Sequence, residues 1–119
     1  MRRAVGPVVL AVTGTLALAA PAGAHVGVKS YSPSPGSTVS RPLERVKVTF
    51  KGRITDGKLT VRRANGTKVS RGDGSVVNRD RVLRVGLKSG LRAGRYTASM
   101  SVLHTDGHVR NKSWSFTLK

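Results

Sequence analysis

The sequence of 119 residues holds three histidines, five acidic residues and no cysteine. Two of the histidines and one acid crowd into the stretch LHTDGHVR as His104, Asp106 and His108, and the third histidine, His25, follows the small residues AGA. The lack of cysteine excludes thiolate metal sites, cysteine nucleophiles and disulfides. Imidazole and carboxylate groups at this spacing can hold a metal ion, but Asp-Gly is also a common turn, so the stretch alone is a weak signal.

A short apolar leader precedes His25. Arg2 and Arg3 are followed by an almost uninterrupted apolar run over residues 4–20, and Ala22-Gly23-Ala24 has the small side chains that a signal peptidase reads. We therefore expect residues 1–24 to be a signal peptide and residues 25–119 to be one exported domain, periplasmic or elsewhere in the cell envelope or outside the cell. This cleavage would make His25 the mature amino terminus.

An amino-terminal histidine can present its α-amine and its imidazole to one metal ion. With a carboxylate and a second imidazole from the HTDGH stretch, the donors are nitrogen and oxygen without sulfur, a set that suits Cu(II), with Zn(II) as the competitor. Cu(I) is disfavoured, because Met100 is the only methionine beyond the leader. Cleavage after Ala22 would instead leave Gly23-Ala24-His25, in which the amine, two amides and the imidazole could wrap Cu(II) without the loop.

The chain is strongly basic, with 22 lysines and arginines against five acids and a formal net charge of +17. Without the two arginines of the leader the expected domain still carries +15. Such a charge attracts polyanions in a salt-dependent way, although it also serves solubility. Only five aromatic residues are present and none lies in a basic cluster, so the composition does not favour nucleic acid as the partner; anionic envelope polymers remain an alternative.

The pattern beyond the leader has a period of two and predicts half-buried β-strands. Apolar residues alternate with polar ones in five stretches, at Val46 to Phe50, Leu59 to Val61, Leu83 to Leu87, Tyr96 to Val102 and Trp114 to Leu118. Turn signals separate these stretches, and no segment has a sustained helical stripe. We therefore predict an all-β, immunoglobulin-like Greek-key sandwich of about seven strands.

Two local predictions concern the turns. Asn65-Gly66 lies between KLTVRRA and TKVS and is typical of a hairpin turn. Asp56, Asp73 and Asp80 lie close to glycine or arginine, and we interpret all three as loop residues.

The order and spacing of these motifs resemble the CopC-type copper-resistance domains, a family of small exported copper-binding β-sandwiches. The resemblance spans nearly the whole of residues 25–119. It is carried by AHV after the leader, by SPSPG at residues 32–36, by LRAGRYTASMSVLHTDGH at residues 91–108, and by the closing WSFTL.

The resemblance implies a Cu(II) site made of the amine and imidazole of His25, the carboxylate of Asp106 and the imidazole of His108. His104 has no counterpart in the family, and we expect it at the surface or in contact with a ligand rather than with the metal. The sequence departs from the family at three positions: Val109 stands where proline is usual, Lys112 where glycine is common, and Met100 where tryptophan is common.

The function implied is that of an exported copper carrier or buffer in copper homeostasis or resistance, which is not an enzyme. We expect a monomer whose partner, a membrane copper transporter, is a separate protein. One alternative is a metal-free basic module that binds anionic wall polymers. A small copper monooxygenase is a further alternative, disfavoured because Asp106 would occupy a position that oxygen needs and because the chain lacks loops for a long substrate.

Overall fold

The computed structural model describes residues 26–119. The expected signal peptide over residues 1–24, its cleavage site and His25 lie outside the described residues. Within residues 26–119 no helix is long and apolar enough to cross a membrane.

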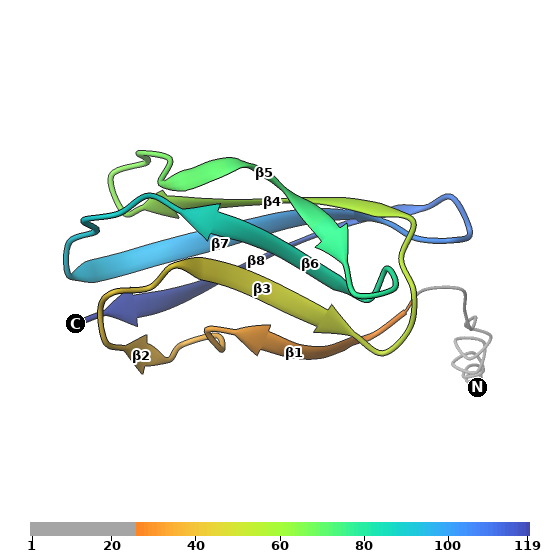
Figure 1. Ribbon diagram of the computed structural model, residues 1–119, viewed down its shortest axis with the longest axis horizontal. Coiled ribbons are helices and arrows are strands. Elements are labelled where there is room, and N and C mark those ends of the chain that lie inside the picture. Colours follow the sequence, from red (N-terminus) through yellow and green to blue (C-terminus); the bar gives the residue numbers. More distant parts are fainter. Residues whose placement is uncertain (1–25) are drawn as a thin grey trace, which may run out of the picture.

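Eight strands form a sandwich of two four-stranded sheets (Figure 1). One sheet has the order β1-β3-β6-β5 and the other the order β2-β8-β7-β4, and the chain changes sheet at every connection except β5–β6 and β7–β8. The strands are β1 (Val28–Ser32), β2 (Thr38–Val39), β3 (Arg45–Phe50), β4 (Asp56–Arg63), β5 (Ser70–Val77), β6 (Val82–Leu87), β7 (Gly94–Leu103) and β8 (Val109–Leu118). All pairs are antiparallel except β2 with β8.

The alternation seen in the sequence is the inward and outward alternation of these strands. The apolar residues of all five predicted stretches are buried and meet in one core between the sheets. The core contains two contacts between aromatic rings. Tyr31 packs against Trp114 with ring centroids 4.7 Å apart, and Tyr96 stacks on Phe116 with ring centroids 6.0 Å apart. The buried indole also donates from Nε1 to the carbonyl oxygen of Pro33 at 3.0 Å, so its polar atom is satisfied.

The predicted sandwich is confirmed, with eight strands instead of about seven because the two-residue β2 adds one. Asp80 lies in a turn as predicted, but the loop interpretation is wrong for Asp56, which begins β4, and for Asp73, which lies within β5. A solvent-facing aspartate fits either position, because both side chains point outward and keep their hydration.

The Asn65-Gly66 turn forms, but it joins strands of different sheets. Gly66 has φ of 92°, and the Asn65 side chain accepts from the backbone N–H of Thr67 at 3.0 Å. Beyond a single bridge between Arg62 and Lys68 the chain leaves β4 and crosses to β5 in the other sheet. The predicted turn is therefore present without a long hairpin.

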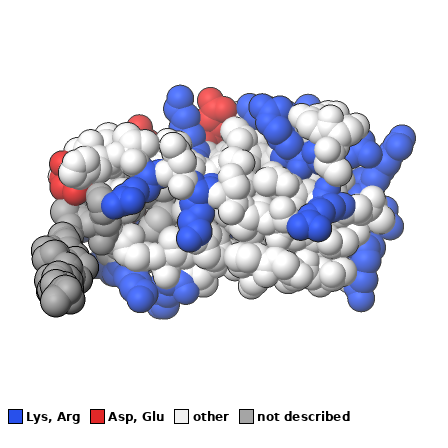
Figure 2. Space-filling model, turned by 180° about the vertical axis from the view of Figure 1, so that it is seen from behind, with Lys and Arg blue, Asp and Glu red and all other residues white. Residues whose placement is uncertain are grey.

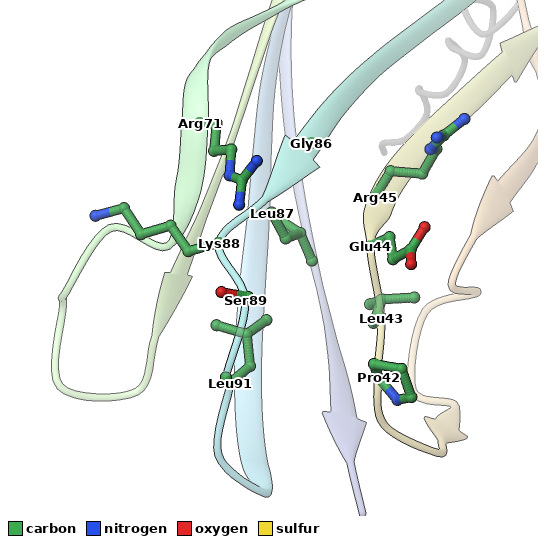
Figure 3. Close-up of a pocket in the computed structure, with 11 residues that line it drawn as sticks. Pro42, Leu43, Glu44, Arg45, Arg71, Gly86, Leu87, Lys88, Ser89 and Leu91 are labelled. Atoms are coloured by element: carbon green, nitrogen blue, oxygen red, sulfur yellow. The ribbon is translucent and has the colours of Figure 1, made fainter.

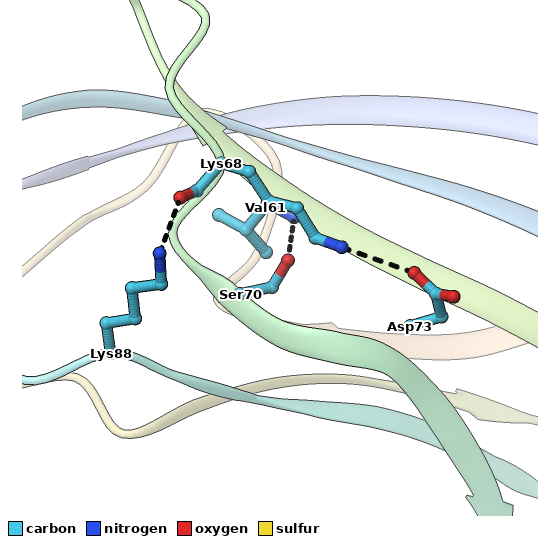
Figure 4. A network of polar contacts seen from close by, with 5 residues as sticks. All are labelled: Val61, Lys68, Ser70, Asp73 and Lys88. Carbon is cyan, nitrogen blue, oxygen red and sulfur yellow. Dashed lines mark hydrogen bonds and ion pairs between the residues drawn. The ribbon is translucent and has the colours of Figure 1, made fainter.

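Polar contacts tie the crossing segment in place (Figure 4). The buried Ser70 hydroxyl accepts from the backbone N–H of Val61 at 3.0 Å, which links β5 to β4. At the surface Lys68 pairs with Asp73 at 3.3 Å, and the Lys88 ammonium donates to the carbonyl oxygen of Lys68 at 3.4 Å. The side chains of Asp73 and Lys88 therefore both have a polar partner on Lys68.

Candidate metal centre

The HTDGH stretch forms the loop of the β7–β8 hairpin. The backbone N–H of His104 donates to the carbonyl oxygen of His108 at 2.9 Å, and that of Gly107 donates to the carbonyl oxygen of His104 at 2.9 Å. Gly107 has φ of 88°, a left-handed conformation that glycine adopts without strain. These contacts define a three-residue hairpin loop that ends on a left-handed residue, a common and tightly fixed connection.

Asp106 holds His108 by two contacts. One carboxylate oxygen accepts from the backbone N–H of His108 at 2.9 Å, and the other lies 2.8 Å from Nδ1 of the same imidazole. The Asp106 side chain is 22% exposed and that of His108 is 72% exposed. A carboxylate that orients an imidazole through one ring nitrogen leaves the other nitrogen, here Nε2, as the metal-binding atom.

His104 is buried, with 4% of its surface exposed. Its Nδ1 accepts from the backbone N–H of Val26 at 3.2 Å, a contact between residues 78 positions apart in the chain. The next residue, Gly27, accepts from the backbone N–H of Lys51 at 2.9 Å. The first contact places the beginning of the described chain beside the β7–β8 loop, and the second joins it to the residue that follows β3 (Figure 1).

The structure therefore brings together the loop residues Asp106 and His108 and places Val26, the residue after His25, at His104. Within residues 26–119 no group of three or more His, Cys, Asp or Glu side chains could hold a metal ion. A site with three protein side chains at this loop needs a donor from outside the described residues, and His25 directly precedes the anchored Val26.

We expected His104 either at the surface or in contact with a ligand. Its burial excludes the surface position. The sequence contains a signal for this burial. Tyr96, Ala98, Met100 and Val102 point inward, and the same period of two places His104 next in that row. The inward position of His104 can be predicted from the sequence in this way, but its hydrogen bond to Val26 cannot.

A cleft of about 400 Å³ opens beside His104 between β1 and β8. Its apolar lining includes Val28, Phe50 and Met100, and Arg110 and Lys112 from β8 also line it. Two of the three positions at which we expect the sequence to differ from the CopC-type pattern therefore lie in this cleft: Met100 is buried, and Lys112 is its cross-strand partner. The third, Val109, is 56% exposed at the start of β8.

Comparison with known proteins agrees with this architecture. The family description "CopC domain" matches residues 28–119. Among solved structures, CopC from Methylosinus trichosporium OB3b superposes with a TM-score of 0.67 at 24% identity, over 80% of this chain and 94% of that chain. PcoC, described as a methionine rich copper resistance protein from Escherichia coli, gives a TM-score of 0.65 at 23% identity, over 81% of this chain and all of that one. No match was found among curated proteins. On the family match the chain belongs to the CopC family.

Proposed function

We propose that this protein is an exported Cu(II)-binding protein that carries or buffers copper in the periplasm or cell envelope and is not an enzyme. Its membership of the CopC family and the description of PcoC as a copper resistance protein support a role with copper. A separate membrane copper transporter is the partner we propose for transfer. Copper is the cargo of this site.

The proposed ligands are the α-amine and imidazole of His25, the carboxylate of Asp106 and the imidazole of His108. The observation that carries this assignment is the hydrogen bond from the Val26 N–H to Nδ1 of His104. It holds the chain one residue after His25 against the loop that carries the other two ligands. A site shared between the chain start and a hairpin 80 residues later then needs no large rearrangement of the backbone.

The donor set supports the oxidation state proposed. Amine, imidazole and carboxylate suit Cu(II), whereas Cu(I) prefers soft sulfur donors. The described chain has no cysteine, and its methionine, Met100, is 7% exposed in the core. Asp106 has both oxygens in contact with His108, and each carboxylate oxygen has a second lone pair that could face a metal.

Titration with Cu(II) in competition with a chelator tests the proposal on the protein that starts at His25. We expect one tight site, an electron paramagnetic resonance spectrum with three nitrogens, and weaker binding of Zn(II) in line with the usual affinity order. The variant His108→Ala should lose most of the affinity and one nitrogen. Full affinity in His108→Ala would overturn the assignment.

A further inference from the structure

The outer face of the β1-β3-β6-β5 sheet carries a cluster of four cations. Arg45 and Lys47 point outward from β3, Arg84 from β6 and Arg71 from β5, and all four are exposed. The strand register places Lys47 directly opposite Arg84, and places Arg45 and Arg71 on either side of Gly86. Like charges that face each other across a sheet destabilise it unless an anion lies between them.

The surface between Arg45 and Arg71 is hollow because Gly86 has no side chain, and Arg84 also lines one of the hollows there. Two adjoining hollows, of about 430 and 390 Å³, share Arg45, Arg71 and Gly86 in their linings. Figure 3 shows the Arg71 guanidinium extending from β5 toward β6, and Arg45 on the opposite wall with its guanidinium directed away from Arg71. We call this feature the arginine groove and define it by Arg45, Lys47, Arg71, Arg84 and Gly86.

The charge of the arginine groove is not neutralised within the described part of the chain. No hydrogen bond or ion pair there engages the side chain of any of its four cations. Asp73 also lines one of the hollows, but it pairs with Lys68 (Figure 4). Glu44 is the remaining acid at the groove, and its carboxylate points away from Arg71 (Figure 3).

A bulge in β5 shapes one wall of the groove. The pairing of β5 with β6 shifts between Arg71 and Ser75, and Gly72 and Gly74 there have φ of 73° and 86°. A Cβ on Gly74 would lie 2.8 Å from the carbonyl oxygen of Arg84, so glycine is required at this position. The wall is therefore a fixed part of the sheet.

We propose that the arginine groove binds a flexible anionic polymer whose repeating charged group is a phosphodiester, of the kind that a cell envelope carries. Three of the four cations are arginines, whose planar forks match phosphate oxygens. The backbones of Arg45 and Arg71 lie two strands apart, roughly 10 Å, and Lys47 and Arg84 lie further along β3 and β6, so successive phosphates of a chain can contact different cations.

Two features favour such a polymer over other polyanions. None of the residues that line the two hollows is aromatic, whereas single-stranded nucleic acid is bound through stacking on aromatic side chains. Three of the four cations line a concavity, and no large apolar side chain in their strands is exposed for insertion into a membrane. A flexible chain fits a groove better than a planar lipid surface does.

The groove also lies away from the candidate metal centre. β3 begins at Arg45 in the groove and ends at Phe50 in the cleft beside His104, a separation of roughly 17 Å along the strand. In Figure 1 the β7–β8 loop is at the right, whereas β3 begins and β6 ends toward the left. A polymer bound in the groove would anchor the protein and leave the metal-binding loop exposed.

The opposite face of the sandwich supplies a control. Seen from behind, the surface is mainly uncharged, with basic side chains over several parts of it, most of them toward the right (Figure 2). Lys58 and Arg62 on β4 and Arg95 on β7 are exposed cations of that other sheet. Replacement of these three changes the net charge by the same amount as replacement of Arg45, Arg71 and Arg84.

The test measures binding of the protein starting at His25 to labelled poly(glycerol phosphate) over a salt series by fluorescence anisotropy. The triple variant Arg45→Gln/Arg71→Gln/Arg84→Gln should bind about tenfold more weakly at low salt. Its plot of log K against log salt should be shallower by about 2, at ~0.7 for each neutralised phosphate of a flexible strand. The control Lys58→Gln/Arg62→Gln/Arg95→Gln should change much less.

Gly86→Thr narrows the part that the two hollows share, without changing the charge. A Cβ at Gly86 meets nothing closer than 4.0 Å, and threonine suits a strand, so this variant should fold and still lose polymer affinity. Thermal unfolding checks the fold of each variant, and Cu(II) affinity should be unchanged in all of them. That independence separates a failure of this proposal from a failure of the copper assignment.

The result that overturns the proposal is an equal loss of affinity in the groove and control triple variants, which would mean attraction by net charge alone. Tighter binding to vesicles of anionic lipid, to oligo(dT) or to polygalacturonate than to poly(glycerol phosphate) would also overturn it, because each would assign the groove to another class of ligand.

Discussion

The backbone N–H of Val26 donates to Nδ1 of the buried His104 at 3.2 Å. An imidazole nitrogen that accepts carries no proton, so this contact assigns the proton of a neutral His104 to Nε2. His104 thus ties Val26 to the segment that leads into the loop. We expect its role to be the positioning of the chain next to His25, the proposed ligand, and not the binding of the metal.

His104→Ala should lower both the free energy of unfolding and the Cu(II) affinity, whereas His108→Ala should lower mainly the Cu(II) affinity. The change leaves a cavity and an unpaired N–H on Val26, and we expect the free energy of unfolding to fall by about 1–3 kcal/mol. Removal of the exposed His108 should hardly change stability. Chemical denaturation measures the first effect and Cu(II) competition the second.

In the copper measurement His104→Ala should be the milder variant, because it loosens a ligand instead of removing one. If the folded His104→Ala protein binds Cu(II) as weakly as His108→Ala, the loop chelates through both histidines and the proposed ligand set is wrong.

Asp106→Ala should weaken Cu(II) binding and leave the sandwich folded, because the residue lies in a hairpin loop outside the core. Two effects combine: the carboxylate is lost as a ligand, and His108 loses the group that orients it. Loss of such an orienting partner alone typically costs about 10–100-fold in metal affinity. Competition titration gives the affinity, and circular dichroism confirms the fold.

Asp106→Asn separates the two effects. The amide oxygen can still accept from the His108 backbone, so the loop keeps its shape, but the negative charge is gone. Affinity close to that of the unchanged protein in this variant would show that the Asp106 charge is not needed at the metal.

Cu(II) affinity should fall steeply as the pH is lowered from neutral to mildly acidic. The proposed amine and both imidazoles bind a metal only in their deprotonated forms, so protons compete with copper at three donors. Affinity measured against one chelator, corrected for the chelator's own protonation, tests this between about pH 5 and pH 8. An affinity that stays flat over this range would contradict the ligand set.

Gly74→Ala should destabilise the fold far more than Gly72→Ala, although both glycines are left-handed and lie in the same bulge. A Cβ at Gly74 would approach the Arg84 carbonyl oxygen to 2.8 Å, whereas one at Gly72 meets nothing within 4 Å. We expect losses of roughly 2–5 kcal/mol for Gly74→Ala and about 1 kcal/mol for Gly72→Ala.

Equilibrium unfolding in urea measures both variants. Equal losses would show that the close approach of β5 to β6 relaxes without cost, and that the wall of the arginine groove is less rigid than the contacts indicate.

The sequence predicts the fold well because each strand has one buried face. Inward rows such as Tyr96 to Val102 appear as alternation within a single stretch, and the turns between them carry glycine at left-handed positions such as Gly107. The loop residues Asp106 and His108 are also visible in the sequence, since their contact is local.

Contacts between distant segments could not be predicted in this way. The bond between Val26 and His104 depends on how β1 lies against β7 and β8, and one sequence carries no signal for that. The arginine groove is equally hidden, because Arg45, Arg71 and Gly86 come from three strands whose register only the folded sheet defines. A high net charge is evident in the sequence, but the meeting of these cations around Gly86 is not.

The last prediction concerns the proposed mature terminus. One alanine added before His25 leaves every side chain in place but turns the α-amine into an amide, which is a poor ligand in its protonated form. Because Val26 is held at His104, the added residue must lie ahead of the site, where its own amine is displaced from the metal. Cu(II) affinity should therefore drop by about 10-fold or more, and the electron paramagnetic resonance spectrum should change. Protein beginning at Gly23 gives the contrasting case, in which the amine, two amides and the His25 imidazole bind Cu(II) without Asp106 or His108. Its affinity should not respond to His108→Ala, whereas that of the protein beginning at His25 should. Unchanged affinity in the alanine-extended protein would exclude the amine of His25 as a ligand. The intact mass of the exported protein would identify which of the two termini the cell produces.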